Sequence, residues 1–586
     1  MEINQKSFIF FLFGIVLCCQ GFAQRDTIST DKLIIIKQYS PTVNDAFKIK
    51  QKPSEKDTIK QKRKTVSYSF IDVPVASTFT PAKGTASGVR MAPPKTLYEN
   101  YARFGAGNYS TLMADFYSNF DLNTDRKIDI QFSHLSSQGG IEDVILDDDF
   151  SNTSLALNLA SEDRYFDWNT GIDLRRREVN YYGISDDLVS KLSEQEFGLI
   201  DPKQTYTRIR ALGGIQFHDS FFKKGEAIIQ NFTDNYSSSE QLLAVESSVE
   251  IPVGYKTLSF NGDFSFLNGG FENSFFDTNE VNYQQFQAGL NPFIDLNYDN
   301  LILKLGAKAV FFNDFEAGSS EIFFYPDIEA EFFLNQETIK INLGVKGDLR
   351  QNTYENFSSR NPFVSPTLSI RPGDQQYNAF AGFSSKLLTN LSLSAQVNYS
   401  STKDYALFRA NPNLDNSTAS GKRSYAFGNS FDVIYNDLDI ATVSADLAYQ
   451  VESDFTFGFY GKYSNFSTEN GEEAWNLPEV ELKAYANYDF TKNWNFSASV
   501  FYVGERKDTM ENVVISPANL PDFNGLTSTS VDGFIDINAS LEYKILPRFS
   551  VFVNAHNLLN NSYNRWQNYE VQGIQVLGGL IYQFDW

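Results

Sequence analysis

Cysteine and histidine are scarce in this chain of 586 residues, which has only two cysteines and three histidines. Cys18 and Cys19 both lie in a leader segment that we expect to be removed, so the mature chain offers no disulfide framework and no thiolate nucleophile. His134, His218 and His556 are far apart in the sequence and have no cysteine nearby, whereas a metal site needs convergent ligands. We therefore predict no metal, no cofactor, no catalytic residues and no enzymatic activity.

Long hydrophobic runs are also missing after the first 23 residues. Because a membrane helix needs roughly 20 consecutive apolar residues, a helical membrane protein is excluded. Residues 1–23 have the pattern of a signal peptide, in which Lys6 provides the positive start, Phe8–Cys19 the short apolar core, and Gly21–Ala23 a small-x-small cleavage site. Acylation of a cysteine, as in a lipoprotein, is the alternative, and the residues that precede the two cysteines disfavour it.

Residues 24–96 lack sustained periodicity and are rich in lysine. They hold 14 lysines and arginines against 6 acidic residues, a net charge of +8, whereas residues 97–586 have a net charge of −31. The segment contains six prolines and few apolar residues, so it can bury little apolar surface. We therefore predict that it is extended or disordered. Such a basic segment on an acidic body is either a soluble linker or a contact for an acidic partner or for anionic lipid head groups.

Aromatic residues and strict alternation are what the chain has in excess. It contains 53 phenylalanines and 31 tyrosines, and from about Leu97 onward apolar and polar residues alternate in many segments, such as Val480–Phe490 and Ile535–Tyr543. Successive side chains of a strand point to opposite faces, so each segment predicts a strand with one apolar face. In the last segment, Ile574–Trp586, every second residue is apolar or glycine. We expect this strand to direct insertion of the protein into a membrane through Gly578, Leu580, Tyr582, Phe584 and Trp586.

The breaks between these segments alternate in length. Short breaks such as Leu122–Arg126 and Leu546–Arg548 alternate with long ones such as Gly183–Gln204, Asn352–Pro366 and Lys403–Lys422. Short turns on one side and long loops on the other are typical of an outer-membrane β-barrel.

The strand number follows from this alternation. We find 24 candidate segments, and the short–long order fails near Pro366–Asn390 and near Phe431–Val451. Merging one pair in each region gives 22, an even number, while 20 and 24 stay possible. We therefore predict an all-β protein, a large antiparallel transmembrane β-barrel over residues 97–586 in the outer membrane of a Gram-negative cell. The signal peptide 1–23 and a short extended periplasmic segment 24–96 precede it.

Three segments in the C-terminal third of the chain together resemble the last strands of TonB-dependent receptor barrels. In Leu391–Tyr399, Phe549–Leu559 and Gln572–Phe584, a near-terminal Asn-Leu strand is followed by a loop and by a glycine-led strand that ends in an aromatic residue. The resemblance implies a receptor-like barrel. Those receptors carry a globular plug much longer than residues 24–96, which do not look globular, so active import is not implied. Four residues are similar to the short box that TonB grasps, or could add a strand to a partner: Leu33, Ile34, Ile35 and Ile36.

Four other segments have both an ordinary and a functional interpretation. His218–Ser220 is predicted to be a short turn rather than part of a hydrolase site, because a catalytic triad is recognised by geometry and not by adjacency. The acidic run Glu142–Asp149 is predicted to be a solvated loop, with divalent-cation binding near lipopolysaccharide as the alternative. Ser185–Phe197 could form a short helix, which would serve as a lid or a partner contact. Tyr405–Asn413 either folds inward as a constriction or packs against neighbouring loops.

A barrel of this size encloses a lumen that wall side chains alone cannot close. Long loops, the basic segment or another protein must fill it. The missing plug and the basic segment favour a non-enzymatic subunit of an outer-membrane assembly for protein insertion, secretion or surface export. The alternative is a transporter or diffusion channel for polar solutes, either open or plugged by a partner. The expected partners are outer-membrane lipid, lipopolysaccharide and proteins of the outer membrane or periplasm, with no nucleic acid.

Overall fold

The computed structural model describes residues 98–334, 338–414, 421–451, 454–469, 471–509, 514–515 and 528–586. The predicted signal peptide, the basic segment and the segment Leu33–Ile36 lie outside these ranges. Among the described residues, no helix is both long and apolar enough to cross a membrane.

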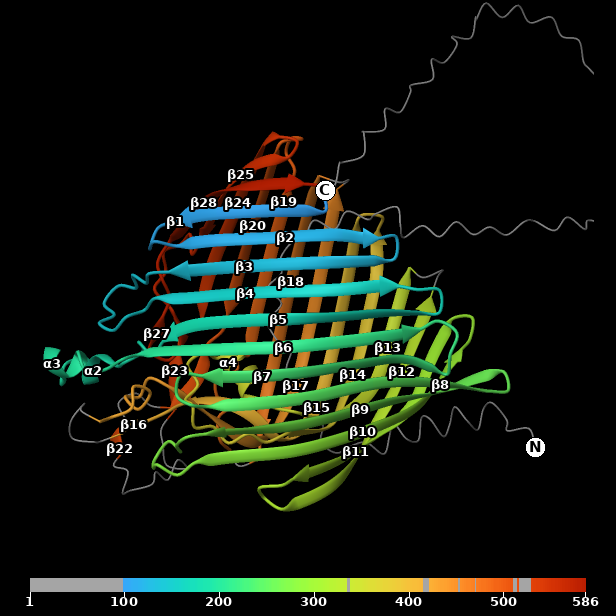
Figure 1. Cartoon of the computed structure of the whole chain (residues 1–586), viewed down its shortest axis with the longest axis horizontal. Coiled ribbons are helices and arrows are strands. Elements are labelled where there is room, and N and C mark those ends of the chain that lie inside the picture. Colours follow the sequence, from blue (N-terminus) through green and yellow to red (C-terminus); the bar gives the residue numbers. More distant parts are fainter. Residues whose placement is uncertain are drawn as a thin grey trace, which may run out of the picture. The chain divides into compact units, whose positions relative to one another are not determined.

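A single sheet of 22 antiparallel strands forms the body of the protein. Its strands are β1 (Asn100–Gly107), β2 (Leu112–Asn123), β3 (Arg126–Ser137), β4 (Phe150–Glu162), β5 (Phe166–Asn180), β6 (Lys203–Phe217), β7 (Phe222–Asp234), β8 (Ser239–Val253), β9 (Lys256–Phe271), β10 (Val281–Asn297), β11 (Leu301–Asp314), β12 (Ser319–Leu334), β13 (Ile339–Arg350), β14 (Gly373–Leu388), β15 (Leu391–Ala410), β17 (Phe431–Val451), β18 (Phe455–Thr468), β19 (Val480–Tyr488), β20 (Trp494–Val503), β24 (Phe534–Leu546), β25 (Phe549–His556) and β28 (Gln575–Phe584). The first strand, β1, pairs with the last, β28, which closes the sheet into a barrel (Figure 1). The predicted fold class and strand number are confirmed.

The alternation of the sequence becomes the two faces of this barrel. Large hydrophobic side chains such as Phe324, Ile229 and Val397 remain exposed on the outer face. The inner face carries the polar partners, for example Lys462 on β18, whose ammonium lies 2.6 Å from the carboxylate of Glu481 on β19. An apolar outer wall around a polar interior suits insertion into lipid.

The two ends of the barrel have different connections. At one end, the short-turn end, the strands are joined by two to five residues. At the other, the loop end, connections reach 30 residues and carry the remaining elements, which lie on the left in Figure 1. These elements are α2 (Asp186–Val189), α3 (Glu194–Phe197), α4 (Tyr354–Arg360), and the pairs β16 (Asn413–Leu414) with β22 (Val514–Ile515), β21 (Arg506–Thr509) with β23 (Ser528–Val531), and β26 (Asn564–Trp566) with β27 (Tyr569–Glu570).

Some predicted boundaries differ from the structure. The prediction that Tyr405–Asn413 is a loop is wrong for its first six residues, because β15 continues to Ala410. That strand end is buried on both faces, so its sequence does not alternate. The merged segment Phe431–Val451 is one strand, as predicted. Ser185–Phe197 forms two short helices, α2 and α3, instead of one.

Candidate functional site: a cap of loops inside one end of the barrel

Residues 351–372 join β13 to β14 at the loop end and fold into the barrel; we call them the cap loop. Its helix α4 begins where the hydroxyl of Thr353 accepts a hydrogen bond from the N–H of Asn356 at 3.0 Å. Tyr354, Val364 and Leu368 are all 0 % exposed. Connecting loops ordinarily lie on the protein surface. The cap loop instead packs like a small internal core.

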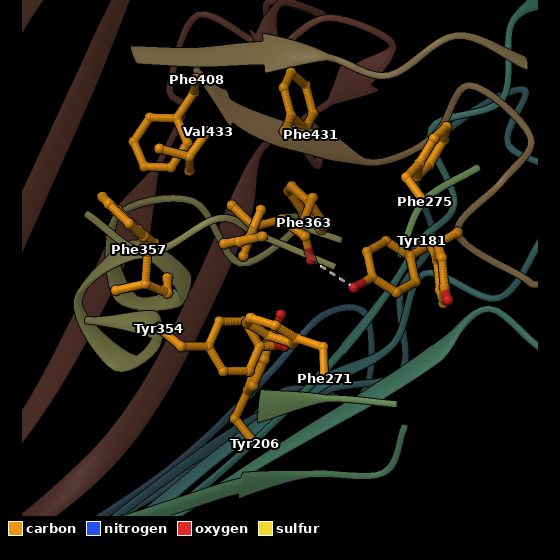
Figure 2. Packing of buried hydrophobic residues seen from close by; sticks show 14 of the residues in the cluster. Tyr181, Tyr206, Phe271, Phe275, Tyr354, Phe357, Phe363, Phe408, Phe431 and Val433 are labelled. Carbon is orange, nitrogen blue, oxygen red and sulfur yellow. Dashed lines mark hydrogen bonds between the residues drawn. The ribbon is translucent and has the colours of Figure 1, made fainter. Parts of the chain in front are cut away.

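The cap loop belongs to a cluster of aromatic and aliphatic residues from distant strands, shown in Figure 2 and called the cap core. Tyr181, just after β5, donates its hydroxyl to the carbonyl oxygen of Val364 at 2.7 Å. Burial raises the pKa of Tyr181 well above its ordinary value, so this phenol stays protonated and donates. Phe363 stacks on Tyr569 with ring centroids 3.6 Å apart. The buried residues of the cap core are Val179, Tyr181, Tyr206, Phe232, Leu267, Phe271, Phe275, Tyr283, Tyr354, Phe357, Phe363, Val364, Leu368, Ile370, Ala406, Phe408, Ala410, Leu414, Tyr425, Ala426, Phe431, Val433 and Tyr569.

A carboxylate from the barrel wall holds the first turn of α4. Glu240 on β8 is fully buried, and its two oxygens accept hydrogen bonds from the N–H groups of Tyr354 at 2.6 Å and Glu355 at 3.2 Å. Tyr283 on β10 donates its hydroxyl to the same carboxylate at 2.9 Å. A negative charge is stabilised by the unpaired N–H groups at the start of a helix. Glu240 therefore fixes the position of α4 against the wall.

Arg208 on β6 provides a second charged contact. Its Nη1 donates to the carboxylate of Glu355 on α4 at 2.8 Å, and its Nε donates to Asp173 on β5 at 3.1 Å. The three side chains are at most 16 % exposed, so each charge depends on its partner for compensation. The cap loop is thus held to two adjacent strands by one arginine.

The other side of the cap loop is tied to different strands. Val364 and Phe431, the first residue of β17, form an isolated parallel bridge, and the N–H of Ser365 donates to the carbonyl of Phe431 at 2.9 Å. Gln285 on β10 donates to the carbonyl of Ile370 at 2.7 Å. Because β6, β8, β10 and β17 are separate parts of the ring, the cap loop spans the interior instead of following one wall.

A second buried polar group lies beside the cap core. Asp508 in β21 accepts hydrogen bonds from the N–H of Ala410 at 2.8 Å and from the side-chain amide of Asn476 at 2.6 Å. Burial raises the pKa of Asp508 to about 6, because loss of hydration penalises its charged form more than these bonds and the positive charge of Arg409 favour it. This group ties the end of β15 to the long connection before β24.

Away from the cap loop the inner wall is polar. Ser394 on β15 faces inward and is exposed. Charged side chains also pair along the wall, where the ammonium of Lys308 lies 2.9 Å from the carboxylate of Asp263 and 2.8 Å from that of Asp348. Such a wall suits contact with water and with polar solutes.

The predicted acidic loop has a local structural role. The carboxylate of Asp148 accepts hydrogen bonds from the N–H groups of Gly140 at 3.1 Å and Ile141 at 2.8 Å, which shapes the turn. No group of three or more potential metal ligands occurs within the described ranges. The two bonds give Asp148 a role in the shape of this loop, and the solvated-loop interpretation stays a prediction.

The turn at His218 lies between β6 and β7, as predicted. Both ring nitrogens of His218 are engaged, one with the carboxylate of Asp167 at 2.9 Å and the other with the carbonyl of Arg164 at 3.2 Å. No nitrogen is then left to activate the neighbouring Ser220. The geometry gives no support to a hydrolase site here.

The predicted insertion strand is β28, which lies between β1 and β25. Gly578, Leu580 and Tyr582 are exposed on its outer face, where the alternation put them. Phe584 is the last residue of the strand, and beyond it the indole N–H of Trp586 donates to the hydroxyl of Ser118 at 2.9 Å. The role of this strand in insertion stays a prediction.

Three residues that matter most for the cap loop were missed from the sequence: Glu240, Arg208 and Glu355. Each is an isolated charged residue in an ordinary polar position, and no spacing marks it. One signal in the sequence could have indicated that this loop is buried. The segment Asn352–Pro366, which we expected to be an outer loop, contains three aromatic residues, Tyr354, Phe357 and Phe363.

Neither a family model nor a curated protein matches this chain. Solved structures match its fold. The FrpB iron transporter from Neisseria meningitidis superposes with a TM-score of 0.62 at 10 % identity, covering 83 % of this chain and 82 % of that one. The ferric-catecholate import receptor Fiu from K12 E. coli gives 0.58 at 11 %, covering 84 % and 82 %. The ferripyoverdine receptor of Pseudomonas aeruginosa gives 0.59 at 11 %, covering 84 % and 72 %. The resemblance to TonB-dependent receptor barrels is thereby confirmed at the level of the fold.

Proposed function

We propose that this chain is an outer-membrane transporter in which the cap loop closes a polar lumen and must move before a polar solute can pass. The observation that carries the proposal is the combination of an exposed polar inner wall with a loop core built across one end. The apolar outer face would lie in the lipid of the Gram-negative outer membrane, in contact with lipopolysaccharide. The loop end then faces outward, and residues 24–96 enter the periplasm.

The matched structures support transport over assembly. They are an iron transporter, a ferric-catecholate import receptor and a receptor bound to ferripyoverdine. From them we carry over transport of a polar solute, with ferric chelates as the first class to test. The sequence alone favoured the assembly subunit over the transporter, and the matched structures reverse this preference. The argument for the assembly subunit was based on residues 24–96 and not on the barrel.

Planar-bilayer recording tests the role of the cap loop. Replacing residues 352–371 by an Asn-Gly turn should open a large and stable conductance, whereas the native protein should conduct little. The matched control replaces residues 186–197, which carry α2 and α3 and contribute nothing to the cap core, by the same turn. Equal conductance of the native protein and the cap-loop variant contradicts closure by this loop.

A subunit of an outer-membrane assembly remains the second candidate, because a segment with a net charge of +8 precedes an acidic barrel. In that case affinity purification in mild detergent recovers a stoichiometric partner, and deletion of residues 24–90, which contain Leu33–Ile36, abolishes the recovery. A barrel that purifies alone counts against this function and leaves the transporter in place.

A further inference from the structure

Four arginines gather on the inner wall beside the cap loop, on the adjacent strands β5 and β6. We call them the arginine cluster: Arg175, Arg177, Arg208 and Arg210. Arg175 lies directly opposite Arg208 in the register of the two strands. At the next inward-facing position toward the short-turn end, Arg210 lies opposite Asp173. Because like charges that face each other across a strand pair destabilise a sheet, the cluster is stabilised by an anion among its members.

In the structure one such anion is a carboxylate of the cap loop. Glu355 on α4 accepts a hydrogen bond from Nη1 of Arg208 at 2.8 Å, and the two side chains are only 12 % and 9 % exposed. Arg177 also contacts α4, where its Nη1 donates to the carbonyl oxygen of Ser358 at 3.3 Å. The cap loop thus covers one half of the arginine cluster and places its own carboxylate there.

The other half of the arginine cluster is accessible and poorly compensated. Arg175 is exposed, and the side chain of Arg210 is 33 % exposed. Within the described residues, no carboxylate lies at ion-pair distance from Arg175, and the ion pair of Arg210 with Asp173 is 3.9 Å long. Asp173 is itself already bonded to Nε of Arg208 at 3.1 Å. Two accessible guanidinium groups therefore lack a close anionic partner.

Movement of the cap loop would change the charge balance of the arginine cluster. With the loop in place, four positive charges are matched by two carboxylates, those of Asp173 and Glu355. Glu355 belongs to the loop and leaves with it, whereas Asp173 belongs to the wall and stays. Guanidinium groups have planar forks of N–H donors that match the two oxygens of a carboxylate. A solute that carries a carboxylate can therefore take the place that Glu355 leaves.

We propose that the arginine cluster binds a carboxylate group of the transported solute on the lumen side of the cap loop, and that Glu355 occupies this place while the loop is closed. Arg175 and Arg210 contact the solute first because they are accessible, and Arg208 joins them once Glu355 has left. The identity of the ligand as the transported solute rests on the proposed function. Among ferric chelates, the site selects those that keep a free carboxylate.

Titration calorimetry with citrate, used as a metal-free tricarboxylate, tests the site on the full-length protein in a non-ionic detergent. Glu355→Gln should bind citrate about tenfold more tightly than the native protein, because it frees Arg208 and removes a competing negative charge. Adding Arg175→Gln or Arg210→Gln to this variant should weaken binding about tenfold or more. The control is Glu246→Gln, which removes an exposed carboxylate from the inner face of β8, two strands away from the cluster, and should leave the affinity unchanged.

Two further variants guard against an effect of misfolding. Arg175→Gln alone leaves every contact of the cap loop in place and should also weaken binding of citrate to the native protein. Arg175→Lys keeps the charge without the planar fork, so its affinity should lie between those of the arginine and glutamine proteins. An unchanged near-ultraviolet circular dichroism spectrum shows for each variant that the aromatic packing of the cap core is intact.

The result is separable from that of the bilayer experiment, because citrate binding is measured without transport. If the cap-loop variant does not conduct but citrate binds as expected, closure by the cap loop is wrong and the carboxylate site stands. The proposal is overturned if Glu355→Gln binds citrate no better than the native protein, if neither arginine variant weakens binding, or if the neutral polyol sorbitol binds as well as citrate.

Discussion

Glu240 and Tyr354 are separated by 114 residues, yet the carboxylate of the first accepts a hydrogen bond from the backbone N–H of the second at 2.6 Å. One residue belongs to the barrel wall and the other to the first turn of α4. Apolar packing is not directional and would tolerate several placements of the cap loop. A buried carboxylate that accepts hydrogen bonds from two backbone N–H groups allows only one placement. Glu240 in the barrel wall therefore determines the position of the cap loop.

Glu240→Gln should loosen the cap loop. The amide keeps one acceptor oxygen but presents an NH₂ group to the N–H of Glu355, which leaves that buried donor without its acceptor, a loss of about 1–3 kcal/mol. Hydrogen exchange followed by mass spectrometry should show faster exchange in residues 351–360. Glu246→Gln is the control, because Glu246 is on the same face of β8 and is exposed. Equal exchange in the two variants would show that Glu240 does not hold the loop.

Arg208→Met should destabilise the cap core by about 3–5 kcal/mol, because it leaves the buried carboxylate of Glu355 without its ion-pair partner and Asp173 with only Arg210, 3.9 Å away. The thermal transition followed by near-ultraviolet circular dichroism, which reports aromatic packing, should shift to lower temperature. Adding Glu355→Gln should recover part of the loss. If the double variant melts no higher than Arg208→Met alone, the ion pair is not the source of the effect.

The sequence was informative about the wall and nearly silent about the cap loop. Alternation is a local pattern, so strands such as β19 and β24 could be predicted residue by residue. The lengths of the breaks between strands predicted which connections are short turns and which are long loops. The end of β15 was missed because both its faces are buried. The cap loop depends on Glu240 and Arg208 meeting residues more than 100 positions away, and no local pattern carries that information.

Asp508 should make the stability of the loop end depend on pH. Its pKa is about 6 in the folded protein and 3.8 in its ordinary environment. Between these values the folded state holds a proton that the unfolded state has released, so the contribution of Asp508 is fully present below the ordinary pKa and is lost as pH rises through the folded pKa. The difference amounts to about 3 kcal/mol.

Hydrogen exchange in residues 405–410 and 506–509, corrected for intrinsic rates, should therefore show less protection at neutral pH than at mildly acidic pH. Asp508→Asn cannot titrate and should give a flat profile over the same range. A wild-type profile parallel to that of Asp508→Asn would assign the pH dependence to another group.

Leu580→Arg should impair insertion of the barrel into the membrane. Leu580 is 49 % exposed on the outer face of β28, and an arginine facing lipid near the bilayer midplane costs about 2–4 kcal/mol. Gln583→Arg is the matched control, since Gln583 lies on the inner face of the same strand, where a charge meets water. The folded fraction can be followed by heat-modifiable migration in gels and by recovery in the outer-membrane fraction. Deleting residues 575–586 is the stronger change, because β1 and β25 both lose their partner and two open edges face lipid. If Leu580→Arg inserts as well as Gln583→Arg, the apolar face of β28 does not lie against lipid, and the membrane placement of the whole barrel must be reconsidered.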